Sequence, residues 1–152
     1  MIVNFEMKLI VTIIMRILPP LVMAVIPYLF FMNDYKSIDI GIFQFLGGPL
    51  LVLGLIITMP SLWQWGKNPT NELFVEGLYK YSRNPQYLGY ILILSGNVFL
   101  ISSFKVLKLT IMMFIFVNIL IYYVEEPKLR KEFGESYIEY CKKVNRWFTF
   151  IK

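Results

Sequence analysis

The chain has 152 residues, of which 57% are hydrophobic and 16% are charged, and its formal net charge is +5. An average soluble domain is about 45–50% apolar and about 25% charged, so this composition excludes a soluble globular domain and predicts a single membrane domain over residues 1–152. Histidine is absent and Cys141 is the only cysteine, which excludes Ser-His-Asp and Cys-His catalysis, an internal disulfide and a thiolate-rich metal site.

Four apolar stretches predict membrane-spanning helices, because each has the roughly 20 residues that such a helix needs. They cover about residues 9–33, 40–66, 84–104 and 106–124. Backbone groups in lipid must be satisfied within the segment, so helices are expected rather than strands. The short connection Ser102–Lys108 predicts that the last two helices form a hairpin. The expected fold is therefore an all-α integral membrane bundle.

Basic residues gather on one side of this four-span topology. That side carries both termini and the Lys67–Arg83 loop, whereas the other carries only Lys36, Lys105 and Lys108. The positive-inside rule places the basic side, with both termini, in the cytoplasm. Arg16, within the first stretch, is expected to extend its charge towards that interface. Nucleic acid is not expected as a partner, because the basic residues are interspersed with glutamates.

The tail, residues 125–152, has a different pattern from the spans. Its apolar residues recur every three or four positions, which predicts an amphipathic helix on the cytoplasmic membrane surface or over the end of the bundle. Pro127 suits the first turn of this helix, and Gly134 is expected to divide it into two. The apolar stripe contains Leu129, Phe133, Tyr137, Tyr140, Cys141, Val144, Trp147 and Phe148.

The segment GLYKYSRNPQYLG, Gly77–Gly89, is the first candidate for chemistry. Pro85 biases Asn84 away from helix and then starts a helix itself. The free N–H groups at that start, together with Arg83, suit an anionic group such as a carboxylate. The segment's tyrosines suit stacking on a planar base or facing a cation. The same residues also fit a plain loop end with interfacial aromatic anchors.

The second candidate segment is EEPKLR, Glu125–Arg130. Its two adjacent carboxylates, at the expected membrane boundary, suit ribose hydroxyls or an ammonium group. Glu126 and Arg130 are four residues apart, a spacing at which they can pair on a helix. The alternative is structural, since Glu-Glu-Pro also makes a good helix start.

Together, the two segments resemble the isoprenylcysteine carboxyl methyltransferase and phospholipid methyltransferase superfamily. The resemblance covers about the C-terminal half of the chain, and its specificity comes from the order and spacing of both segments. Asn84 stands where many members have histidine, and Asn145 where proline is common. The matching positions are Gly77, Tyr79, Arg83, Asn84, Pro85, Tyr87 and Gly89, then Glu125, Glu126, Leu129, Phe133, Gly134, Tyr137, Tyr140 and Val144.

The resemblance implies an integral membrane enzyme that transfers a methyl group from S-adenosylmethionine to a lipophilic acceptor arriving from the bilayer. Since this sulfonium cofactor supplies the electrophile, the protein mainly binds and orients. A carboxylate acceptor, like that of an isoprenylcysteine, is favoured over an amine headgroup because it needs no base. The cofactor-binding residues implied are Tyr79, Tyr81, Arg83, Asn84, Pro85, Tyr87, Gly89, Glu125 and Glu126.

Three residues are expected to be catalytic. Arg83 is assigned to the cofactor carboxylate or an acidic acceptor, Glu126 (or its neighbour Glu125) to the ribose or amino group, and Arg130 to Glu126 or the acceptor. The tail helix is expected to cover the cytoplasmic mouth of the site. Two alternatives stay open: an NADPH-dependent membrane reductase of the sterol-reductase type, whose motifs are similar, and a non-enzymatic membrane module.

Overall fold

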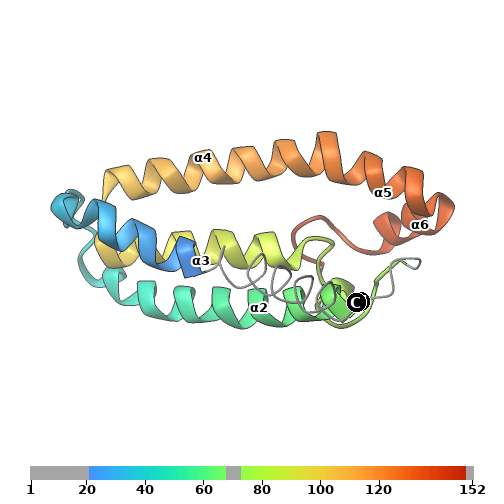
Figure 1. The fold of residues 1–152 in the computed structure, drawn as a ribbon. Helices are drawn as coiled ribbons and strands as arrows, with labels where there is room; N and C mark the ends of the chain where they lie inside the picture. Colours follow the sequence, from blue (N-terminus) through green and yellow to red (C-terminus); the bar gives the residue numbers. More distant parts are fainter. Residues whose placement is uncertain (1–20, 68–72, 150–152) are drawn as a thin grey trace, which may run out of the picture.

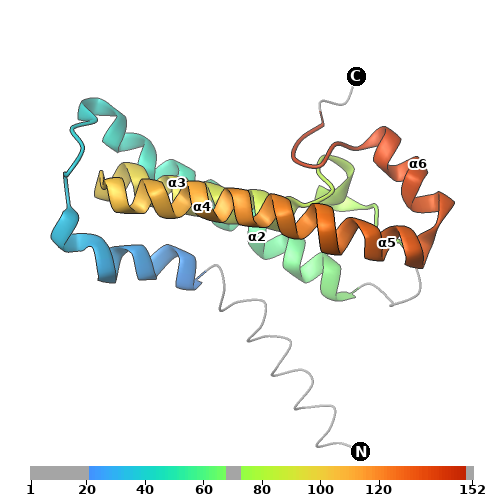
Figure 2. The ribbon, with the colours of Figure 1, turned by 90° about the horizontal axis from the view of Figure 1, so that it is seen from above.

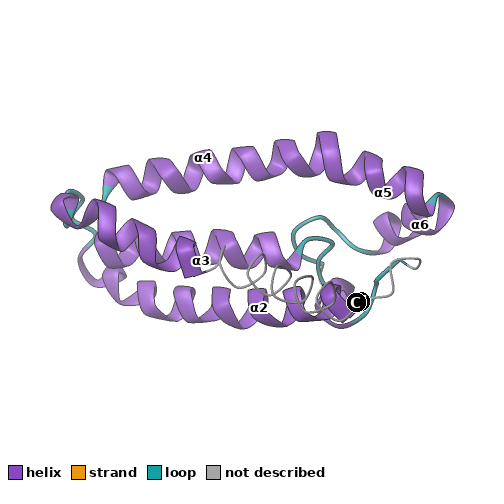
Figure 3. Cartoon of the chain, viewed as in Figure 1, coloured by secondary structure: helices purple, strands orange, loops and turns teal. Residues whose placement is uncertain are grey.

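The structure is a computed structural model that describes residues 21–67 and 73–149. Within these residues every regular element is a helix and none is a strand, which confirms the expected all-α class (Figure 3). Residues 9–20 of the first predicted span, Arg16 included, lie outside the described residues, and the rest of the span contains an apolar helix, Leu21–Phe31.

Three long helices form the body of the molecule. In Figure 1, α2 (Gly47–Lys67) lies below α3 (Pro85–Ile101), and α4 (Phe104–Leu120) lies above it. Figure 2, seen from above, shows α4 passing over the other two. The remaining described elements are the short turns η1 (Met32–Asp34), η2 (Gly41–Leu46) and η3 (Gly77–Lys80), the π turn η4 (Ile121–Glu125), and the helices α5 (Glu126–Phe133) and α6 (Glu135–Lys143).

Two continuous helical stretches are long and apolar enough to cross a membrane: Gly41–Gln64, with 24 residues, and Phe104–Phe133, with 30 residues. Leu21–Phe31 and Pro85–Ile101 are apolar but shorter. The predicted stretches at about 40–66, 84–104 and 106–124 therefore correspond to helices. Crossing by all four stretches, and the cytoplasmic side of the termini, stay predictions.

The helix does not break at the boundary predicted between the last span and the tail. The helix begun by α4 continues through η4 into α5, as far as Phe133. At the junction the Glu126 N–H donates to the Ile121 carbonyl five residues back, in the manner of a π turn. Pro127, the next residue, has no N–H to give the usual helical bond. The wider turn accommodates it without ending the helix.

Gly134 divides the tail into two helices, as predicted. It has φ +53 and ψ −126, and no atom lies within 4 Å of the position where a Cβ would be. Beyond α6, however, the prediction of a helix is wrong, because Val144 is extended, with φ −122 and ψ 126. Residues 144–149, called here the tail strap, turn back towards the loop before α3. The apolar spacing of Val144 and Trp147 fits a helix, but the backbone from Val144 onward is irregular and bends.

A seam of four glycines holds α2 against α3. Gly47 and Gly54 on α2 face Gly96 and Gly89 on α3, in antiparallel order. A Cβ on Gly96 would lie 2.7 Å from the Leu51 backbone nitrogen, and one on Gly54 would lie 2.7 Å from the Gly89 carbonyl oxygen. Small residues of this kind let helix backbones approach closely in membranes. The seam therefore fixes where α3 begins relative to α2.

The opposite end of the bundle, on the left in Figure 1, is tied by polar contacts. The hairpin between α3 and α4 forms as predicted, with Ser102 in the left-handed region at φ +52 and Ser103 capping α4. Ser103 Oγ also donates to Asp34 Oδ2 at 2.5 Å, and Lys105 Nζ lies 3.4 Å from Asp34 Oδ1. The hydrogen bond from Ser103 lowers the pKa of the Asp34 carboxyl. The end of η1 is thereby fastened to the hairpin.

We expect Gly96→Ala to lower the stability of the bundle by about 1–3 kcal/mol, the usual range for overpacking. The matched control is Gly48→Ala, because no atom lies within 4 Å of a Cβ at Gly48. That change should be neutral or stabilising, since alanine is the better helix former by about 1 kcal/mol. Thermal unfolding in detergent, followed by circular dichroism, measures both. Equal melting temperatures for the two variants would contradict a close-packed seam.

Candidate functional site

The two candidate segments of the sequence meet at one end of the bundle, on the right in Figure 1. Tyr87, in the first turn of α3, donates its hydroxyl to Glu125 Oε1 at 2.5 Å. Arg83, in the turn before α3, places Nη1 3.3 Å from Glu126 Oε1. Segments about 40 positions apart in the sequence are thus joined through both glutamates.

The turn before α3 is fixed by its own sequence and by the tail strap. Pro85 occupies the first turn of α3, and Asn84 N–H donates to Ser82 Oγ at 3.1 Å. The Arg83 N–H donates to the Asn145 carbonyl at 3.0 Å. The Asn84 Nδ2 donates to the Arg146 carbonyl at 3.4 Å. The side chain of Asn84 thus helps to hold the strap.

Glu126 is the centre of a buried ion cluster and is only 7% exposed. Arg146 binds it with two parallel hydrogen bonds, Nε to Oε1 and Nη2 to Oε2, both 3.0 Å long. Arg83 adds the contact to Oε1 and also donates Nη1 to Cys141 Sγ at 2.6 Å. One buried carboxylate is therefore matched by two guanidinium groups.

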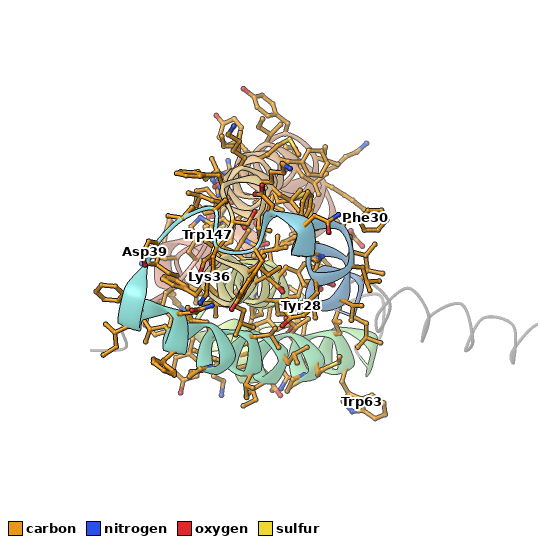
Figure 4. All side chains as sticks on the ribbon, turned by 90° about the vertical axis from the view of Figure 1, so that its left-hand side faces the viewer. Tyr28, Phe30, Lys36, Asp39, Trp63 and Trp147 are labelled. Carbon is orange, nitrogen blue, oxygen red and sulfur yellow. The ribbon has the colours of Figure 1, made fainter. Side chains whose placement is uncertain are left out.

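The tail strap closes over this cluster. Thr149 N–H donates to the Tyr81 carbonyl at 2.7 Å, and Ser82 Oγ donates to the Arg146 carbonyl at 3.2 Å. Trp147 stacks on Phe114 of α4, with ring centroids 5.4 Å apart and planes at 28°. Figure 4, viewed along the bundle, shows Trp63 projecting outward from α2, whereas Trp147 lies within the outline of the bundle.

Tyrosines surround Glu125 and the turn. Tyr79 is buried, and its carbonyl accepts a 2.6 Å hydrogen bond from Tyr140 Oη. Burial raises the pKa of Tyr79, and the nearby charge of Glu125 adds to the rise. Tyr87 and Tyr90 pack edge to face, with ring centroids 6.1 Å apart. Glu125 thus faces neutral phenols rather than a basic residue.

The tail helix α6 contributes a small core of its own beneath the strap. Tyr137, Tyr140 and Val144 are buried together, and Cys141 packs against them. Burial raises the pKa of Tyr137 to about 12, with Cys141 adding to the rise, so its phenol is neutral at physiological pH. This core holds Cys141 beside Arg83.

Several predicted site residues lie elsewhere. Arg130 was expected to pair with Glu126 or with the acceptor, and the first alternative is wrong: Arg130 is exposed, and Glu126 is paired with Arg83 and Arg146 within the described residues. A contact of Arg130 with the acceptor stays a prediction. Gly89 faces α2, where a Cβ would lie 2.0 Å from Thr58 Oγ1. Tyr81 is 45% exposed and contributes its carbonyl rather than its ring. Helical spacing suggested Arg130, but the strap supplies Arg146 instead.

Sequence reasoning missed Arg146 and the contact made by Cys141. Arg146 lies 20 positions after Glu126, and no local sequence pattern around either residue predicts that they pair. The sequence VNRW, residues 144–147, gave one signal that the last turn differs, because Asn145 stands where the resemblance described above leads one to expect proline.

Two polar atoms of the site are available to a ligand. Arg83 Nε is buried and has no hydrogen-bond partner in the part of the chain that the structure describes. The second oxygen of Glu125 accepts no hydrogen bond from the described residues either. A buried guanidinium suits a carboxylate or phosphate, and a carboxylate among phenols suits an ammonium or hydroxyl group.

A comparison with protein families finds one match: the family described as phospholipid methyltransferase, over residues 42–136. The matched region runs from η2 through α2, α3 and α4 to the start of α6, and it includes Arg83, Tyr87, Glu125 and Glu126. Arg146 lies beyond it. No curated protein matches the chain.

Proposed function

Because the chain belongs to the phospholipid methyltransferase family, within the isoprenylcysteine/phospholipid methyltransferase superfamily, we propose that it transfers a methyl group from S-adenosylmethionine to a lipophilic acceptor in the membrane. The observation that carries this proposal is the convergence of Arg83, Tyr87, Glu125 and Glu126 at one end of the bundle. Residues of the two motifs, far apart in the sequence, form one polar cluster there.

The residues present fit this cofactor. S-Adenosylmethionine, when bound, would supply the electrophilic methyl group, and the protein would bind and orient it. Arg83, whose side chain is 13% exposed and whose Nε lacks a partner in the described chain, suits the amino-acid carboxylate. Glu125, oriented by the Tyr87 hydroxyl, suits the ammonium or a ribose hydroxyl.

The tail strap gives the site its cover. With Trp147 stacked on Phe114 and the strap bonded to the turn, the polar cluster is shielded on its tail side. Excluding water strengthens each charged contact and helps to hold the reacting groups in line. A lipophilic acceptor would then reach the site from the bilayer, between the helices.

Two acceptor classes remain in the proposal. A carboxylate acceptor needs no base, which suits a chain without histidine. An amine headgroup must lose a proton, and Glu125 places a carboxylate at the site that can take it. This position of Glu125 supports the amine headgroup as the second candidate.

The proposal is tested by calorimetric titration of the detergent-purified protein with S-adenosylhomocysteine, with NADPH in a parallel experiment. We expect micromolar binding of S-adenosylhomocysteine and no binding of NADPH. Binding of NADPH alone would favour the reductase alternative instead. No binding of either, by protein shown to be folded, would contradict the proposal and favour a non-enzymatic module.

The acceptor class is tested by Glu125→Gln in an assay with saturating methyl-labelled cofactor, so that a weaker hold on the cofactor does not enter kcat. With an amine headgroup phospholipid, loss of the base should lower kcat by about 100-fold, the lower end of the range for general-base catalysis. With a prenylcysteine acceptor the loss should stay below about tenfold, since no proton is removed. Base treatment separates the products, because methyl esters release methanol and N-methyl groups do not. Glu132→Gln, an exposed carboxylate on α5, is the control.

A further inference from the structure

The ion cluster contains more positive charge than Glu126 requires. Arg146 already bonds both carboxylate oxygens, at 3.0 Å each. Arg83 reaches Oε1 with a single nitrogen, at the longer distance of 3.3 Å. A bidentate guanidinium is the stronger partner of a carboxylate. Arg146 therefore neutralises Glu126, and the charge of Arg83 is in excess.

Arg83 is held in place without being satisfied. Its Nη1 also donates to Cys141 Sγ, and its Nε is buried without a partner among the described residues. An unpaired buried donor on a charged group is costly unless something else binds it. Together with the excess positive charge, this unpaired donor favours an anion as the missing partner.

We infer that Arg146 is a positioning residue for the proposed site: by neutralising Glu126, it leaves the guanidinium of Arg83 available for an anionic group of the ligand, a carboxylate or a phosphate. The inference rests on the proposed function but names a residue outside the matched family region. Without Arg146, the buried Glu126 would keep Arg83 as its remaining charged partner, and the cluster would lose its net positive charge.

Arg146 is fixed at both of its ends. Its carbonyl accepts hydrogen bonds from Ser82 Oγ at 3.2 Å and from Asn84 Nδ2 at 3.4 Å. Its guanidinium carbon lies 5.8 Å from the centre of the Tyr122 ring. The strap thus presents this side chain to Glu126 from a backbone that is bonded to the same turn that carries Arg83.

The test measures S-adenosylhomocysteine binding by the full-length protein in detergent. Arg146→Gln should weaken binding by about tenfold to 100-fold, the size of one hydrogen bond to a charged group. Adding Glu126→Gln to Arg146→Gln should restore much of that loss, because Arg83 is no longer captured by a lone carboxylate. Lys143→Gln, which removes an exposed charge three residues away, should change binding less than about twofold.

Two further measurements distinguish the two possible sources of the anion, the cofactor and the acceptor. If it is the cofactor carboxylate, Arg146→Gln should not affect binding of the decarboxylated analogue of S-adenosylhomocysteine. If it is an acceptor phosphate, S-adenosylhomocysteine binding should be unchanged and the KM for a phospholipid acceptor should rise about tenfold.

Two results would overturn the inference. One is an Arg146→Gln protein with unchanged S-adenosylhomocysteine binding and unchanged acceptor KM. The other is a double variant weaker than the single one, which would mean that each change merely loosens the fold. If Arg146→Gln does not fold, Arg146→Lys replaces it: lysine keeps the charge but not the two parallel hydrogen bonds, so a binding loss that adding Glu126→Gln does not relieve would count against the inference. Failure of the unaltered protein to bind S-adenosylhomocysteine would instead refute the proposed function.

Discussion

A buried carboxylate must be neutralised, and in this protein that requirement joins three distant parts of the chain. Glu126 lies just after the π turn that joins α4 to α5, Arg83 precedes α3, and Arg146 belongs to the tail strap. Removing one partner of a buried charge is far more costly than losing a surface pair. The turn before α3, the start of α5 and the tail strap are consequently held in one arrangement, and the candidate site lies where they meet.

The helices serve this arrangement by fixing positions. The glycine seam brings α3 close to α2 and fixes their positions along the bundle axis. The turn that carries Arg83, which directly precedes α3, is thereby fixed as well. The π turn before Pro127 carries Glu125 and Glu126 into the cluster without ending the helix. Neighbouring residues on a helix point about 100° apart, so the two glutamates face different partners. Glu125 meets the Tyr87 hydroxyl, and Glu126 meets the two arginines.

The sequence predicts the parts of this structure that depend on local patterns. The helical class, the hairpin at Ser102–Ser103 and the break at Gly134 all follow from hydrophobic runs and residue conformational preferences. The pairing of the two motifs came from a resemblance, and the contacts of Arg83 and Tyr87 agree with it. Periodicity gave a wrong prediction only where tertiary contacts decide the backbone: the strap has helical spacing but an irregular backbone.

Residue roles were harder to predict than helices, for the same reason. Arg130 had the right helical spacing to reach Glu126, yet Arg146, which is 20 residues away, occupies both carboxylate oxygens. Gly89 sits within the motif but packs against Thr58 of α2. In each case the partner comes from a separate segment, and a single sequence does not show which distant segments come into contact.

The central claim, that Glu126 holds the turn and the strap together, is tested most directly by hydrogen exchange of the full-length protein. The amides of Arg83 and Thr149 each donate across the junction between turn and strap. In Glu126→Gln, both should lose protection together while α3 amides stay protected, and exposed Glu139→Gln should change neither. Unchanged protection of both amides in Glu126→Gln would contradict the account.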